Sequence, residues 1–301
     1  MKNNGIKHQI LKLWFKTHDV ICLHKIKKEF PVSIMTSEQT IAYIKKTNCS
    51  IARYGDGEFD LMMQVCAENY QNISDELSSA LRNVFQNQSE HLLICLPHPI
   101  VSTKRLKKHG KAFWRGWCIK RQKRIVSELR SLKAANYRFG DAFVSRPYSG
   151  YQSEKYSQKL FGLLKELWEG RNILFVEGYQ TRLGVGNDLF SNAKSIKRIL
   201  CPAENAFNVY EKILGTIADC WQGELVVLAL GPTATVLASD LSRKGVQALD
   251  LGHIDIQYEW YLAGTSYVPV KGKYTNETLD GRQPEACEDE SYLSQIISVI
   301  K

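Results

Sequence analysis

The 301-residue sequence has no pair of cysteines at CxxC spacing, no long apolar run and no leader-like start. Its eight cysteines are scattered, which argues against zinc sites and a disulfide framework and predicts reduced thiols in a cytoplasmic protein. The longest clean apolar run covers residues 225–230, far below the roughly 20 residues of a membrane span. Charged residues interrupt every apolar stretch near the N-terminus, which excludes the core of a signal peptide.

Acidic residues are scarce in two segments, and these segments account for the formal net charge of +9. Residues 1–30 carry seven lysines against two acids, and residues 101–133 carry twelve Lys and Arg against a single glutamate. The rest of the chain is net acidic, which excludes a protein with a basic surface all round. The two basic segments instead indicate local contact with an anionic partner.

The two basic segments each allow more than one interpretation. Residues 1–30 form an amphipathic arm that either packs on the following domain or contacts an anionic membrane surface. Residues 104–133 are expected to be helical, with breaks near Gly110 and Gly116. The aromatic residues among these lysines and arginines are either buried under a solvated charged helix or placed to stack on the sugar rings of an acceptor.

Strand-like and helix-like segments alternate from residue 37 onward. Short apolar runs predict strands at residues 50–54, 92–96, 172–177, 196–200, 224–230 and 246–251, and helical patterns are clearest at residues 203–221, 232–244 and 254–262. This alternation predicts a Rossmann-like α/β fold with a mostly parallel sheet and helices on both faces. We expect a basic N-terminal arm (1–35), an α/β domain (36–268) and an acidic tail with a short terminal helix (269–301).

Four polar turns follow predicted strands, where ligands of parallel α/β sheets bind. The first is RYGDGE at residues 53–58, in which glycines flank Asp56 and Glu58. Two carboxylates on one tight turn suit a hard cation that bridges a diphosphate, because Mg²⁺ and Mn²⁺ prefer oxygen ligands. The same pattern is also typical of a helix start in which an acid caps free backbone amides.

The second and third turns are rich in glycine. In EGYQTRLGVGND (177–188), Arg182 suits bidentate contact with a phosphate, whereas the alternative is a loop in which Asp188 caps the next helix. The GxG within it is too short a match to predict NAD binding. GPTAT (231–235) offers free helix amides to an anion, or is an ordinary helix start with proline in its first turn.

The fourth turn, GHID at residues 252–255, combines a histidine with an aspartate. His253 or Asp255 suits the role of a base, of a substrate ligand or of a residue that orients one. A lone histidine is also typical of a structural position. If these strands lie side by side in one parallel sheet, all four turns face one crevice.

Taken together, these segments resemble the GT-D-fold glycosyltransferases, a family first described as a domain of unknown function. The matching segments are RYGDGEFD (53–60), FGDAFVSRPY (139–148), VEGYQTRLGVGNDLF (176–190), CPAENAF (201–207), ALGPTATVLASDL (229–241) and DLGHIDIQYEWYL (250–262). They run in order over about residues 36–265. The resemblance implies a Rossmann-like, metal-dependent glycosyltransferase that moves a sugar from a nucleotide donor, typically a UDP-sugar.

The resemblance also implies site residues, carried over on the matching segments. Asp56 and Glu58 would form the DxE motif that holds Mn²⁺ or Mg²⁺. The positions expected to bind the donor are Arg53, Arg146, Arg182, Asn187, Asp188, Asn205, Gly231 and Thr233. Asp255, Glu177 and His253 are the candidates for the base that takes the proton of the acceptor hydroxyl, with Asp255 favoured.

The family further implies an acceptor that is a glycan, a glycoprotein or a lipid-linked saccharide, in bacterial surface polysaccharide or glycan synthesis. We expect a cytoplasmic protein, with peripheral contact at the inner face of an anionic membrane as an option. A different class of function is a nucleic-acid-binding module that uses residues 101–133, although no RNA- or DNA-binding motif is present and no specific nucleic acid is expected. A third is a catalytically silent scaffold, against which the intact DxE motif argues.

Overall fold

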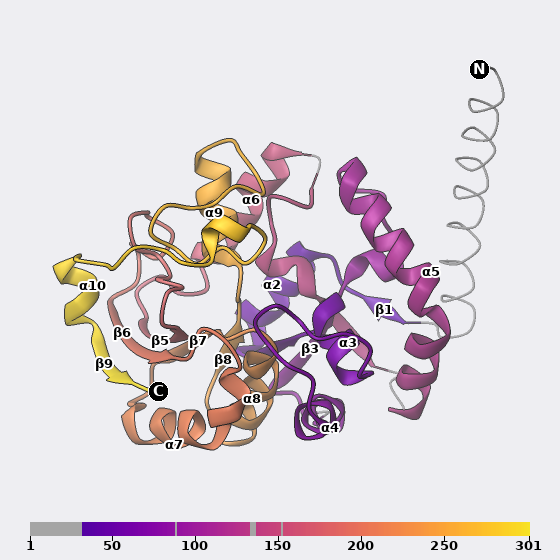
Figure 1. Cartoon of the computed structure of the whole chain (residues 1–301), viewed down its shortest axis with the longest axis horizontal. Helices are drawn as coiled ribbons and strands as arrows, with labels where there is room; N and C mark the ends of the chain where they lie inside the picture. Colours follow the sequence, from indigo (N-terminus) through magenta and orange to yellow (C-terminus); the bar gives the residue numbers. More distant parts are fainter. Residues whose placement is uncertain (1–31, 88, 133–136, 152) are drawn as a thin grey trace.

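Figure 1 shows a computed structural model of the chain, which describes residues 32–87, 89–132, 137–151 and 153–301. Within these residues nine strands form one sheet, and every pairing is parallel. The spatial order is β1 (Ser33–Ile34), β4 (Arg138–Asp141), β3 (Leu92–Leu96), β2 (Ser50–Arg53), β8 (Ala248–Asp250), β7 (Leu225–Ala229), β5 (Asn172–Gly178), β6 (Ser195–Cys201) and β9 (Ile296–Val299). The predicted Rossmann-like α/β fold is confirmed.

The central strands are continuous apolar runs, as expected for a sheet that is covered on both faces. All five residues of β3 (LLICL) and all five of β7 (LVVLA) are buried. The edge strand β9 is more open, since half-buried and exposed side chains alternate along it and the exposed ones are Ile297 and Val299. The hydrophobic core therefore lies along the middle of the sheet and fixes the strand ends.

Helices lie on both faces of the sheet (Figure 1). They are α2 (Ser37–Thr47), α3 (Asp56–Met62), α4 (Asp75–Val84), α5 (Lys108–Ser131), α6 (Glu154–Lys165), α7 (Tyr210–Cys220), α8 (Pro232–Arg243), α9 (Ile254–Leu262) and α10 (Glu290–Ser294). Right-handed crossovers place α4, α7 and α8 on one face and α2 and α6 on the other. The contacts agree, since α8 touches α4 and α7 while α2 touches α6.

The crevice for a ligand follows from this topology. Strands β2 and β8 are neighbours, and the chain leaves β2 into α3 and β8 into α9. The right-handed crossovers that follow carry the two connections to opposite faces of the sheet, which opens a gap beyond the carboxyl ends of the two strands. The turns RYGDGE and GHID both border this gap.

Helix α5 runs without a break from Lys108 to Ser131, so the predicted interruptions at Gly110 and Gly116 are absent. A glycine inside a helix costs about 1 kcal/mol relative to alanine. Burial of the apolar face offsets that cost, because Trp114, Trp117, Ile125 and Leu129 are among its buried side chains. Two of the interleaved aromatics are therefore buried, as one of the interpretations of this segment held.

The predicted boundary at residue 268 does not separate a tail from the domain. The terminal strand β9 pairs with β6, and the amide of Ile300 donates to the carbonyl of Leu200 at 2.7 Å. Helix α10 is the short terminal helix that was expected. At the other end, most of the predicted arm lies outside the described residues, and Ser33 and Ile34 pair with β4 as the edge strand β1.

The described helices include none that is both long enough and apolar enough to cross a membrane. The longest of them, α5, carries basic residues along its length.

Candidate active site

A cavity of about 600 Å³ lies at the carboxyl edge of the sheet, over the gap between β2 and β8. Residues that follow strands line it, among them Arg53 after β2, Gly231 after β7 and His253 after β8. The start of α5 and the segment after α9 complete the wall. All four of the predicted turns reach the cavity, the second of them through Gly178 and Thr181 only.

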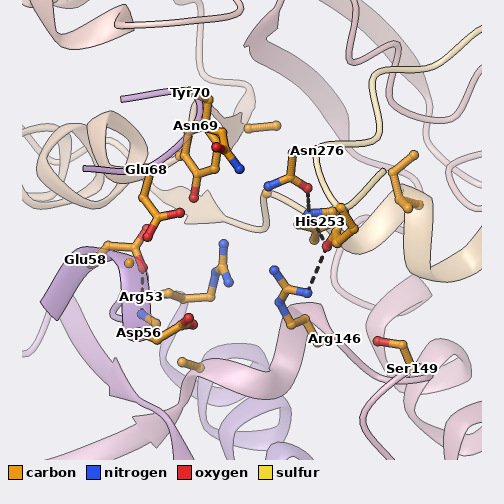
Figure 2. A pocket seen from close by; sticks show the side chains of 18 of the residues that line it. Arg53, Asp56, Glu58, Glu68, Asn69, Tyr70, Arg146, Ser149, His253 and Asn276 are labelled. Atoms are coloured by element: carbon orange, nitrogen blue, oxygen red, sulfur yellow. Dashed lines mark hydrogen bonds and ion pairs between the residues drawn. The ribbon is translucent and has the colours of Figure 1, made fainter. Parts of the chain in front are cut away.

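Three carboxylates, those of Asp56, Glu58 and Glu68, lie together on one side of the cavity (Figure 2). Asp56 and Glu58 belong to the first turn of α3, and Oε2 of Glu58 accepts a hydrogen bond from the amide of Gly55 at 2.7 Å. Glu58 thus caps the helix, as the alternative interpretation held, and also borders the cavity. The two interpretations of the DxE turn are compatible.

The environment of these acids disfavours their charge. Burial raises the pKa of Asp56 and of Glu58. Burial, followed by repulsion from Asp56, Glu58 and Asp60, raises the pKa of Glu68 to about 7. A divalent cation beside these groups would relieve the repulsion and favour their ionised forms.

The carboxylates at the cavity are the possible ligands for the divalent cation that the resemblance implies. The described residues contain no group of three or more His, Cys, Asp and Glu side chains arranged to hold an ion. Mg²⁺-type sites that serve phosphate substrates commonly use only one or two carboxylates and complete their shell with phosphate and water. The pair Asp56 and Glu58, with Glu68 beside it, fits such a cation in its chemistry.

Two glycines are required by close approaches in the cavity wall. A Cβ at Gly57 would lie 2.8 Å from Oε1 of Glu68, so any other residue there would make that carboxylate shift away from α3. Gly231 has a φ of 53°, and a Cβ there would lie 2.7 Å from the ring of Tyr70. These glycines leave room for Glu68 and Tyr70 at the cavity, and neither of these two residues was predicted from the sequence.

The two arginines of the cavity are held differently. Arg53 donates to the carbonyl and carboxylate of Asp250 and to the hydroxyl of Ser145, so its guanidinium is fixed on three sides. Arg146 pairs with Oε1 of Glu277 at 3.2 Å, and its guanidinium points into the space between the acids and His253 (Figure 2). Arg146 is therefore the better placed of the two to bind an anion.

His253 sits at the opposite side of the cavity from the acids (Figure 2). Its Nε2 lies 2.7 Å from Oδ1 of Asn276 and 2.9 Å from Oε1 of Glu277. Burial alone would raise the pKa of Glu277, but the charges of His253 and Arg146 outweigh it and lower the pKa to about 2. Nδ1 of His253 and Oε2 of Glu277 are buried without a hydrogen-bond partner among the described residues.

The other two predicted bases lie outside the cavity lining. Asp255 accepts hydrogen bonds from the amide of Gly184, the side chain of Asn187 and the ammonium group of Lys273. Glu177 is fully buried, where it pairs with Arg198 and accepts from the amide of Leu183. Both carboxylates join loops to the core, which does not support the predicted role as base.

Five predicted donor positions are also outside the lining. Arg182 donates to the backbone carbonyls of Gly272 and Glu285, so it holds the C-terminal segment and not a phosphate. Asn187, Asp188 and Asn205 bond to other side chains or to backbone, and Thr233 is fully buried. Of the eight predicted donor positions, the cavity brings together Arg53, Arg146 and Gly231.

Several lining residues escaped the sequence analysis. Glu68 and Tyr70 come from the loop between α3 and α4, and Asn276 and Glu277 come from the segment assigned to an acidic tail. The signal for the first pair was weak, since the loop carries one acid among polar residues. For the second pair the acidic composition pointed to a solvated tail, although Lys273, Tyr274 and Thr275 beside it are not typical of one.

We expect Glu68→Gln to stabilise the protein at pH 8 in EDTA. The folded-state pKa of about 7 lies above the ordinary value of 4.5, so the stability that Glu68 contributes when protonated is lost as the pH rises through 7. After allowance for partial exposure, removing the charge recovers about 1–2 kcal/mol at pH 8, or about 2–4 °C in melting temperature.

Thermal melts at pH 5 and pH 8 test this expectation. At pH 5 the difference should be small, because Glu68 is then protonated in the folded protein. Glu288→Gln, which removes a charge from an exposed acid, is the control and should leave the melting temperature unchanged at both values. A lower melting temperature for Glu68→Gln at pH 8 would contradict the charge repulsion described above.

Comparison with known proteins agrees with this geometry. A family model described as the glycosyltransferase GT-D fold matches residues 51–278. The chain belongs to the GT-D glycosyltransferase family. The GT-D match extends to residue 278 and so includes Asn276 and Glu277, which agrees with the placement of this segment in the domain and not in a tail.

Two streptococcal relatives are similar to this GT-D chain. The probable glycosyl transferase Gly of Streptococcus gordonii is 37% identical over 273 residues, which cover 90% of this chain and 39% of that protein. Glycosyltransferase GlyD of Streptococcus pneumoniae serotype 4 is 36% identical over 271 residues, which cover 89% of this chain and 33% of that protein. The chain thus spans only 33–39% of the length of these curated relatives.

Solved GT-D structures match along nearly the whole chain. One, described as a domain of unknown function 1792 with a distinct glycosyltransferase fold, has a TM-score of 0.84 at 35% identity and covers 94% of this chain and all of that chain. Another, described as a new glycosyltransferase from Streptococcus sanguinis, has a TM-score of 0.82 at 35% identity and covers 90% of this chain and all of that one. The resemblance drawn from the sequence is confirmed.

Proposed function

We propose that this GT-D domain transfers a sugar from a nucleotide-sugar donor, with UDP as the nucleotide, to a hydroxyl group of a glycan, glycoprotein or lipid-linked saccharide. The reaction would serve bacterial surface polysaccharide or glycan synthesis. The observation that carries the proposal is the gathering of Asp56 and Glu58 opposite Arg146 in one cavity. The acids suit the cation and the arginine suits the phosphate oxygens, so together they suit a diphosphate with a bound cation. Neither the acids nor the arginine alone would hold such a complex.

Asp56 and Glu58 would hold the divalent cation, Mn²⁺ or Mg²⁺. The cation would supply positive charge where negative charge develops on the departing nucleoside diphosphate. Glu58 is kept in place by its bond to the amide of Gly55, so its carboxylate is oriented before any ligand binds. Glu68 approaches the pair across Gly57 and adds to the negative charge that attracts the cation.

Arg146 would bind the diphosphate from the other side. Its pairing with Glu277 fixes the guanidinium at the cavity while leaving it directed inward. Arg53, held by Asp250 and Ser145, keeps the carboxyl end of β2 and the start of β8's turn together and adds a second positive charge. The backbone at Gly231, which has no side chain to obstruct it, lines the same space.

His253 is the one of the three predicted bases that lines the cavity, and we assign it the proton of the acceptor hydroxyl. Two oxygen acceptors, from Asn276 and Glu277, face Nε2, so in the neutral ring Nε2 carries the proton and Nδ1 carries the lone pair. Nδ1 and the second oxygen of Glu277 are buried without hydrogen-bond partners among the described residues, which leaves the lone pair of Nδ1 for the proton of the hydroxyl. Glu277, ionised above about pH 2, stabilises the imidazolium that results.

Arg146→Met should weaken UDP binding in the presence of Mn²⁺ by about 10- to 100-fold, because a charged hydrogen bond of roughly 1.5–3 kcal/mol is lost. Calorimetric titration with UDP measures the change. Arg243→Met, at an exposed arginine that pairs with Asp240 away from the cavity, is the matched control. If Arg146→Met bound UDP as tightly as the unchanged protein, the proposed diphosphate contact would be wrong.

A screen of UDP-glucose, UDP-galactose and UDP-N-acetylglucosamine identifies the donor. Hydrolysis or transfer is measured with Mn²⁺ and again with EDTA. We expect turnover of at least one of these donors with Mn²⁺ and its loss with EDTA. Absence of both binding and turnover for every nucleoside diphosphate would overturn the proposal.

A further inference from the structure

One part of the cavity wall has no role in the donor site described above. It is formed by the start of α5, by a residue after β4 and by the segment after α9, and it is largely aromatic: Leu106, His109, Phe113, Trp114, Phe143 and Tyr267. Trp114 and Phe143 are buried, whereas Phe113 is 51% exposed and Tyr267 is 43% exposed. Exposed rings on a cavity wall are available to a ligand that extends into solvent.

Tyr267 is held in an unusual backbone conformation. Its φ is 61°, in the left-handed region that a bulky side chain rarely adopts. Trp260 maintains this conformation, because its ring contacts Tyr267 at a centroid distance of 5.4 Å and its Nε1 donates to the carbonyl of Val268 at 2.8 Å. The ring of His109 meets Tyr267 edge to face at 5.3 Å, which joins α5 to the segment after α9. Such strain persists only where surrounding contacts impose it, and it is concentrated at ligand sites.

The opposite part of the wall differs in shape. Small residues after β5, β6 and β7, including Gly178, Ala203 and Gly231, line it together with Tyr70. The ring of Tyr70 lies against the backbone of Gly231, and an aromatic ring at the cavity suits contact with a planar base. A nucleotide bound on this side would leave the aromatic part of the wall free for the acceptor.

We propose that Phe113, Tyr267 and His109 form an acceptor subsite, in which a pyranose ring stacks its apolar C–H face on the exposed aromatic rings. The proposal rests on the proposed function, since it places the acceptor against a donor held by Asp56, Glu58 and Arg146. The rings bind the sugar through apolar contact, while polar groups at the cavity floor, such as Ser149 and His253, are available to its hydroxyls. The acceptor class is therefore a saccharide whose terminal residue is a pyranose.

The test uses the full chain and three probes: the methyl β-glycosides of glucose, galactose and N-acetylglucosamine. Binding is followed by saturation-transfer NMR, with UDP and Mn²⁺ binding measured separately by calorimetry. Phe113→Ala and Tyr267→Ala should each weaken glycoside binding about tenfold and leave UDP binding unchanged. Phe113→Tyr, which keeps a ring, should retain glycoside binding.

The matched control is Tyr179→Ala, which removes a 56% exposed aromatic ring that does not line the cavity. It should change neither measurement, and thermal melts show whether each variant is folded. Failure of all three glycosides to bind the unchanged protein would overturn the proposal, as would loss of UDP binding in Phe113→Ala or Tyr267→Ala. If the glycosides bind as expected while UDP does not bind at all, the acceptor subsite stands and the proposed donor is wrong.

Discussion

We expect Asp56→Asn and Glu58→Gln each to lower the rate of sugar transfer by about 10²–10³-fold, the size of loss seen when one group that stabilises transition-state charge is removed. Both changes remove a charge and keep the shape of the side chain. Glutamine at position 58 still offers an oxygen to the amide of Gly55, so the start of α3 should remain capped. The melting temperature should therefore stay within a few degrees, and the loss should lie in the chemistry.

Steady-state transfer assays over a range of Mn²⁺ concentrations measure this effect. Glu154→Gln supplies the control, because Glu154 is also an acid in the first turn of a helix but lies outside the cavity. It should transfer sugar at the rate of the unchanged protein. Full activity of both cavity variants would show that the DxE turn takes no part in the reaction. An equal loss of activity in Glu154→Gln would indicate a general effect of removing an acid from the start of a helix.

Glu177→Gln and Arg198→Met each destabilise the protein by about 3–5 kcal/mol, because each leaves the other member of a buried ion pair without its partner. The pair is a structural junction. Arg198 also donates to the carbonyl of Leu183 and lies over the rings of Phe175 and Tyr292, so it ties β6 to the second turn and to α10. The corresponding fall in melting temperature is about 10 °C.

Thermal or urea unfolding of these variants separates a structural residue from a catalytic one. If Glu177 were the base, Glu177→Gln would lose transfer activity and keep its stability. We expect the reverse, namely a large loss of stability with transfer activity retained at a temperature where the variant is folded. A double variant that lacks both partners should recover part of the lost stability, since no buried charge is then left unpaired.

The sequence predicted the fold and the centre of the site because both depend on strand ends. Buried runs such as 225–230 are distinct, and the turns that follow them converge by topology, so position after a strand made Asp56, Glu58 and His253 candidates, and all three line the cavity. Polar residues that follow strands either line a ligand site or hold loops together, and sequence spacing does not distinguish these two roles. Asp255 is an example, since it follows β8 as His253 does but binds Lys273 instead of facing the cavity.

The residues that the sequence analysis missed come from segments without a periodic pattern. Glu68 and Glu277 reach the cavity through loops, and only long-range contacts show where those loops lie. The segment after residue 268 is held by Arg182, which binds its backbone carbonyls, and by Lys273, which is buried between Asp255 and Glu259. Composition described this segment as an acidic tail, whereas these ion pairs make it a wall of the site.

We propose that Asp56 and Glu58 hold a cation which binds the donor diphosphate together with Arg146. Calorimetric titration of UDP into the full chain, with Mn²⁺ and then with EDTA, tests it most directly. We expect UDP to bind with Mn²⁺, to lose at least about tenfold in affinity with EDTA, and to show a similar loss with Asp56→Asn even when Mn²⁺ is present. Equal UDP affinity with Mn²⁺ and with EDTA, or no effect of Asp56→Asn, would contradict it.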